Sequence, residues 1–158
     1  MASLAVYYSW GGNTEAAANG LSSLLGSKSR KIEEIKLRRG PIGIIKGSVT
    51  AFLGSSSDIK PMDTSLKGYS KIFLLTPVWA GSAFPAMNAF IDEADFQGTE
   101  VVLVFTFSSL LRGKSVEKLS RKIESKGGKI AGIIELRCGN LTKEEIFAEA
   151  KNLAGKYL

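Results

Sequence analysis

Histidine is absent from this chain of 158 residues, and cysteine occurs only once, at Cys138. The absence of histidine excludes a histidine general base, a serine–histidine triad and histidine metal ligands. A single cysteine excludes an intrachain disulfide and any cysteine-rich metal or iron–sulfur site. We therefore predict no metal site and no catalytic histidine, and the scarcity of cysteine favours the cytoplasm.

The chain also lacks a hydrophobic run suited to crossing a membrane. Residues 72–91 carry no charged side chain and approach the length of a membrane span, but Pro77, Gly81 and Pro85 interrupt them. Such a run is typical of a strand, a loop and a helix in succession. No basic side chain precedes the first apolar run, so we expect neither a signal peptide nor membrane insertion.

Basic residues exceed acidic residues, 21 against 15, and the formal net charge is +6. A basic surface can attract nucleic acid, anionic membranes or acidic proteins. The lysines and arginines are spread along the chain, and no dense basic run is interleaved with aromatic residues. This distribution is typical of a solvated surface, and we predict no binding of nucleic acid.

Apolar strands alternate with amphipathic helices along the chain. Nearly continuous apolar runs predict four buried strands, at residues 2–8, 69–75, 101–107 and 130–136. An irregular alternation of apolar and polar residues predicts an edge strand at residues 31–37. Helical spacing predicts helices between and after them, at residues 13–25, 45–53, 85–93, 116–123 and 142–157. We therefore predict one α/β domain over residues 1–158, with a parallel sheet covered by helices on both faces.

Three polar loops follow the strands that end at Tyr8, Leu75 and Phe107. In a doubly wound sheet, ligands bind at the carboxyl ends of the strands, where the winding reverses. Because all three loops leave such ends, we expect them to converge on one site.

The first loop is a glycine-rich turn between a strand and a helix. Its glycines let the main chain approach an anion closely, because they have no Cβ. The first N–H groups of a helix lack internal partners, and the helix dipole favours negative charge there. No lysine or arginine lies in this turn, so we predict a phosphate site held mostly by neutral donors of Ser9, Trp10, Gly11, Gly12, Asn13 and Thr14. The alternative is an ordinary turn with Asn13 or Thr14 as the N-cap.

With these loops in place, the chain resembles the flavodoxin family over nearly its whole length. The first loop keeps Ser9, Gly12, Asn13 and Thr14 of the family's phosphate loop S-x-T-G-N-T, with Gly11 in place of the first threonine. That replacement removes one hydroxyl donor. The run T-P-V-W-A-G resembles the family's second flavin loop, and residues 105–109 lie where the third loop belongs.

The resemblance implies a three-layer, doubly wound, five-stranded parallel sheet in the order 2-1-3-4-5, with FMN as cofactor. Besides the first loop, it assigns to FMN the residues Thr76, Pro77, Val78, Trp79, Ala80, Gly81, Phe107, Ser108 and Ser109. Trp79 offers a stacking face to the flavin ring, worth ~0.5–1.5 kcal/mol beyond burial; alternatively, it caps the sheet edge. Gly81 makes the Ala80–Gly81 peptide the easiest to turn when flavin N5 gains a proton, since glycine tolerates a positive φ.

The basic composition departs from that of flavodoxins, which are commonly acidic. Arg112 and Lys114 follow the third loop, and positive charge near the flavin favours its reduced, anionic form. We therefore predict a higher second reduction potential than in acidic flavodoxins, and a redox partner protein with an acidic surface.

The implied function is electron transfer by bound FMN. Two alternatives remain: an NAD(P)H- or quinone-linked FMN-dependent oxidoreductase, and a non-redox interaction module on the same fold. Residues 108–115 also resemble the nucleotide-binding pattern G-x-x-x-x-G-K-[ST]. Because Ser108 replaces the first glycine of that pattern, we do not favour a nucleotide hydrolase.

Overall fold

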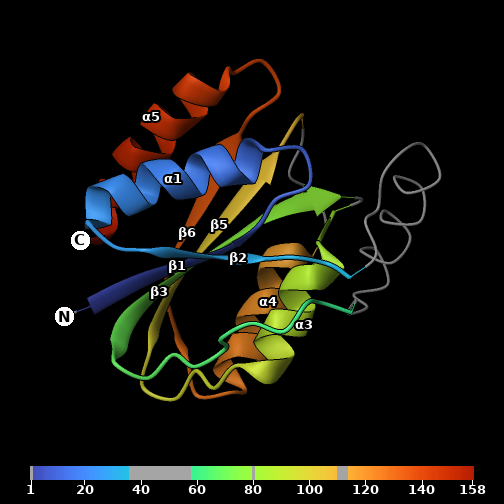
Figure 1. Cartoon of the computed structure of the whole chain (residues 1–158), viewed down its shortest axis with the longest axis vertical. Coiled ribbons are helices and arrows are strands. Elements are labelled where there is room, and N and C mark those ends of the chain that lie inside the picture. The colour runs from blue at the N-terminus through green and yellow to red at the C-terminus, as the bar shows by residue number, and fades with distance from the viewer. Residues whose placement is uncertain (1, 36–57, 80, 110–113) are drawn as a thin grey trace.

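A parallel sheet forms the middle of the molecule (Figure 1). The computed structural model describes residues 2–35, 58–79, 81–109 and 114–158. Within these ranges the parallel strands lie in the order β2-β1-β3-β5-β6. Their bounds are β1 (Ala2–Tyr8), β2 (Ser29–Ile32), β3 (Tyr69–Trp79), β5 (Glu100–Phe107) and β6 (Lys129–Arg137). Counted over these strands, the order is the predicted 2-1-3-4-5.

Helices cover both faces of this sheet, as Figure 1 shows. One face carries α1 (Asn13–Leu25) and α5 (Lys143–Ala154), and the other carries α3 (Pro85–Glu93) and α4 (Ser115–Glu124). Successive strand residues point to opposite faces, so each face has its own buried hydrophobic cluster. The three-layer, doubly wound α/β arrangement confirms the predicted fold class.

The second polar segment is more regular than the sequence predicted. We expected a loop from Thr76, but β3 continues to Trp79 and then turns back into β4 (Ser82–Ala83), which pairs with β3 antiparallel. Pro77 was interpreted as the break in the strand. It lies beyond the last pair between β1 and β3, Tyr7 with Leu75, so it removes no hydrogen bond from that ladder.

Other element ends also differ from the prediction. The edge strand expected at residues 31–37 is Ser29–Ile32, followed by an isolated bridge between Glu34 and Ile59. The closing helix ends at Ala154, and Tyr157 lies in a 3-10 turn, η1 (Gly155–Tyr157). The helix expected at residues 45–53 lies outside the described residues.

Within the described ranges, no helix is sufficiently long and apolar to span a bilayer. The uncharged stretch at residues 72–91 instead supplies most of β3, then β4 and most of α3. Gly81 and Pro85 therefore lie at changes of secondary structure, as expected, whereas Pro77 lies inside β3.

Candidate functional site

The structure brings the first two predicted loops together at the carboxyl edge of the sheet. Trp10 follows β1 and Trp79 ends β3, and their ring centroids are 4.8 Å apart in an edge-to-face arrangement, with an interplanar angle of 75°. Edge-to-face packing is a favourable geometry for aromatic rings. The two loops therefore share one aromatic surface, although they are about seventy residues apart in the chain.

The first loop forms a tight turn whose helix carries no side-chain cap. The Ser9 Oγ accepts a hydrogen bond from the Gly12 N–H at 3.1 Å, and Gly12 has φ 92°, in the left-handed region that favours glycine. Gly12 itself is the N-cap of α1, and no side chain among the described residues accepts from the first turn. The alternative with Asn13 or Thr14 as N-cap is therefore wrong, and the first N–H groups of α1 remain available to an anion.

A lysine from the other end of the chain reaches this loop. The Lys143 Nζ, on the first residue of α5, donates to the Gly11 carbonyl oxygen at 3.0 Å and to the Asn13 Oδ1. A charged donor from α5 therefore lies beside the neutral donors that the loop itself supplies. Sequence reasoning missed Lys143, whose signal is a lysine at the first position of a helix that has glutamates at the next two positions.

The third loop is tied to the first by a pair of buried hydroxyl groups. The Thr14 Oγ1 and the Thr106 Oγ1 are 2.7 Å apart. On the other side, the Cys138 N–H donates to the Phe107 carbonyl oxygen at 2.7 Å. Ser108 and Ser109 follow as exposed residues. The start of α1 therefore contacts the end of β5, although β3 lies between β1 and β5 in the sheet.

Among the predicted site residues 76–81, the first four lie in β3, whereas Gly81 lies in the turn after that strand. The Thr76 side chain is fully buried; its Oγ1 donates to the Pro77 carbonyl oxygen at 3.1 Å and accepts from the Phe84 N–H at 3.3 Å. Gly81 has φ 71°, a conformation that favours glycine. Val78 pairs with β4, and Ala80 lies outside the described residues.

The aromatic surface is anchored in the core below it. The Trp79 ring lies 5.0 Å from the Phe84 ring, edge to face, and Phe84 stacks on Tyr8 with centroids 4.5 Å apart. Trp79 is half-buried, whereas Trp10 is 37% exposed. Trp79 thus caps the core while part of its surface stays accessible, so the two interpretations of this residue are compatible.

The thiol of Cys138 also lies near this edge of the sheet. Burial raises the pKa of the Cys138 thiol, which follows β6 and is 3% exposed. A thiol with a raised pKa is mostly protonated at neutral pH and is a poor nucleophile. Cys138 therefore packs as a small apolar side chain.

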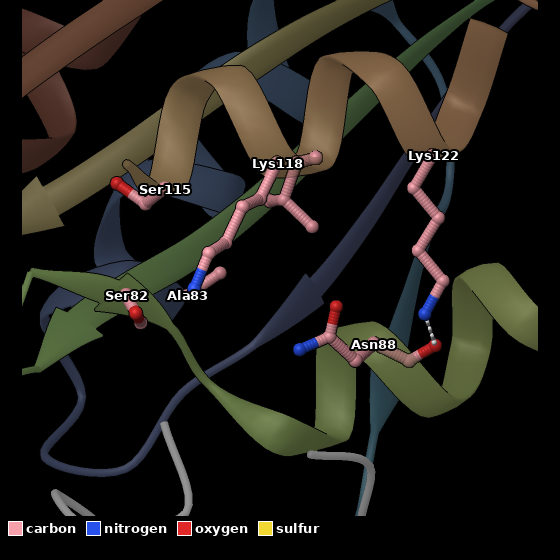
Figure 2. Close-up of a pocket in the computed structure, with 7 residues that line it drawn as sticks. Ser82, Ala83, Asn88, Ser115, Lys118 and Lys122 are labelled. Carbon is pink, nitrogen blue, oxygen red and sulfur yellow. Dashed lines mark hydrogen bonds between the residues drawn. The ribbon is translucent and has the colours of Figure 1, made fainter. Parts of the chain in front are cut away.

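A separate small cavity lies between α3, α4 and β4 (Figure 2). Its volume is about 120 Å³, and Ser82, Asn88, Ser115, Lys118 and Lys122 contribute to its lining. Lys122 donates to the Asn88 carbonyl oxygen at 3.3 Å and pairs with Asp92 at 2.6 Å. None of the residues assigned to FMN lines this cavity, so it is not part of the candidate site.

The strand order and the helices on both faces define a doubly wound α/β fold. Among solved structures, the chain is similar to a candidate flavoprotein from Bacteroides uniformis, with a TM-score of 0.79 and 21% identity, over 98% of this chain and 97% of that one. It is also similar to a flavoprotein in complex with FMN from Lactobacillus acidophilus, with a TM-score of 0.70 and 19% identity, over 85% and 92%.

A third similar structure is the Fusobacterium nucleatum flavodoxin bound to flavin mononucleotide, with a TM-score of 0.56 and 16% identity, over 100% of this chain and 99% of that one. The chain therefore has the flavodoxin-like fold. No family model matches the sequence, and no curated protein matches it.

Proposed function

We propose that this chain is a member of the flavodoxin family that binds FMN and transfers electrons. The observation that carries the proposal is the meeting of an uncapped helix N-terminus and an accessible tryptophan pair at one edge of the sheet. A phosphate needs the first feature, and a flat aromatic ring needs the second. The two FMN-containing neighbours support the same cofactor.

The donor set fits a phosphorylated flavin. The first N–H groups of α1 and the hydroxyl of Ser9 surround the start of the helix, and a Cβ placed on Gly11 would meet no atom within 4 Å. The phosphate would therefore be held by the residues from Ser9 to Thr14. Trp10, Trp79 and the backbone near Gly81 would contact the ring, and Phe107 to Ser109 would close the third side.

When bound, FMN supplies the redox chemistry, and the protein supplies binding, shielding and charge. No general acid or base from a histidine is available, because the chain has none. Electron transfer requires no such group, and this favours a carrier over an enzyme that protonates its own substrate.

The net charge of +6 bears on the potential and on the partner. Positive surroundings favour the form of the cofactor with the extra negative charge, so we propose a higher second reduction potential than in acidic flavodoxins. A spectroelectrochemical titration measures it, and a strongly negative second potential contradicts the proposal. We further propose a redox partner with an acidic surface. The scarcity of cysteine leads us to propose that this chain is located in the cytoplasm.

Titration of the cofactor-depleted protein with FMN tests the proposed function. We expect quenching of flavin fluorescence with one FMN bound per chain, followed on stepwise reduction by two separate one-electron steps. Rapid oxidation of NAD(P)H by the loaded protein would instead indicate an oxidoreductase. A protein that leaves the fluorescence of added FMN unchanged would indicate the non-redox module.

A further inference from the structure

Lys143 lies over the first loop with a charge that nothing in the loop's own sequence provides. Its ammonium bonds to the Gly11 carbonyl oxygen and the Asn13 Oδ1, across 132 and 130 residues of chain. A Cβ placed on Gly12 would lie 3.2 Å from the Nζ. The ammonium is therefore held against the turn from which α1 begins.

The position of Lys143 at the start of α5 is electrostatically unfavourable for that helix. A positive charge at the first position of a helix is unfavourable, because the dipole makes that end positive as well. The capping box of Thr142 and Glu145 already stabilises the start of α5. No ion pair joins Lys143 to a carboxylate among the residues that the structure describes. Glu15 in the first turn of α1 and Glu144 and Glu145 in that of α5 lie nearby in the chain, but the ammonium bonds to the loop instead, where it adds to the positive end of α1.

The ammonium also keeps a hydrogen-bond donor in reserve. A lysine side chain carries three N–H donors, and two of them serve Gly11 and Asn13 in the described structure. The third is available to an anion beside the loop. A charge-assisted bond to phosphate is about twice as strong as a bond between neutral groups.

We infer that Lys143 is a phosphate-binding residue that makes this site select a phosphorylated flavin over an unphosphorylated one. The inference rests on the proposed FMN function and adds to it a residue from α5. In the folded chain, the phosphate site combines the neutral donors of residues 9–14 with one full positive charge. The charge also offsets the loss of the hydroxyl donor at Gly11.

The competing interpretation is that Lys143 only fastens α5 to the loop. The two interpretations differ in what happens to riboflavin, which has the same ring and ribityl chain as FMN but no phosphate. A fastening role acts through the shape of the loop, so its loss also destabilises the cofactor-depleted protein in urea unfolding and weakens the contact of Trp10 with the ring of either flavin. A phosphate contact affects FMN alone.

Fluorescence titrations of cofactor-depleted protein with FMN and with riboflavin separate these outcomes. The variant is Lys143→Met, and the matched control is Lys151→Met, an exposed lysine in the last turn of the same helix. We expect Lys143→Met to weaken FMN binding by about tenfold or more, equivalent to about 1.4 kcal/mol, while riboflavin binding changes by less than about twofold. The salt dependence of FMN binding should fall in the same variant.

Three results would overturn the inference. An unchanged FMN affinity in Lys143→Met would show that Lys143 makes no contact with the phosphate. An equal loss of affinity for both flavins would show that the lysine only fastens α5 to the loop. An equal effect of Lys151→Met reduces the result to net charge. If the wild-type protein binds neither flavin, the proposed function itself fails, which is seen before any variant is compared.

Discussion

The hydroxyl pair between Thr14 and Thr106 provides a direct test of how the first and third loops are joined. The two side chains are 2% and 3% exposed, and their oxygens are 2.7 Å apart. Replacing either threonine with valine keeps the shape and leaves the other hydroxyl buried without its partner. Such an orphaned group costs about 1–3 kcal/mol, whereas replacing both partners with apolar groups of the same shape is nearly neutral.

We therefore expect Thr14→Val and Thr106→Val each to lower the free energy of unfolding by about 1–3 kcal/mol. In a chain of this length that corresponds to a fall in Tm of roughly 2–12 °C. The double variant should be no less stable than either single variant, so the effects are strongly non-additive. Urea unfolding followed by circular dichroism measures all four members of the cycle on cofactor-depleted protein.

Thr99 provides the matched control. Its buried hydroxyl donates to the Phe96 carbonyl oxygen at 2.8 Å, and that oxygen also accepts from the Thr99 N–H at 3.0 Å. Thr99→Val leaves no orphaned partner, so its cost should be about 1 kcal/mol or less and should add to that of Thr14→Val. Additive effects of Thr14→Val and Thr106→Val would refute the hydroxyl pair.

Three further predictions follow from single residues. Gly81→Ala should destabilise the protein by about 1–2 kcal/mol, because Gly81 has φ 71°, and should shift both one-electron potentials of bound FMN; unchanged potentials in spectroelectrochemistry would contradict the role of this peptide. The Lys31 ammonium holds the pKa of the Glu15 carboxyl below its usual value, so the pair stabilises the fold above the unfolded-state pKa and loses this effect as the pH falls through the folded-state pKa. The free energies of unfolding of wild type and Glu15→Gln should therefore differ by less than about 1 kcal/mol at pH 7 and become equal in acid. A difference that stays constant with pH in urea unfolding would disprove the linkage. Cys138 is buried with a raised pKa, so a thiol reagent should label it only after unfolding, and fast labelling of native protein would show that the thiol is accessible.

Local signals in the sequence located the elements around the site well. Helix α1 has the predicted bounds, because Gly26 ends it with φ 59°. Helix α3 begins at Pro85 and ends at Glu93, as expected from a proline suited to the first helical turn. The closing helix begins next to residue 142, as predicted, and Thr142 and Glu145 form its capping box. Each of these features depends on residues within one or two turns of one another.

The features that the sequence did not reveal depend on distant partners. The length of β3 was missed because Pro77 disrupts a strand only where its N–H would be needed, and that depends on where β1 ends. The contact of Lys143 with Asn13 depends on the packing of α5 beside α1. No periodicity or local motif encodes such a pairing. The assignment of individual residues to FMN stays a prediction.

A crystal structure of the protein grown with FMN tests the central claim most directly. We predict one FMN per chain, with its phosphate bonded to the backbone N–H groups at the start of α1 and its ring against Trp79. Flavin bound elsewhere on the molecule, or an unliganded edge of the sheet at saturating FMN, would contradict the account.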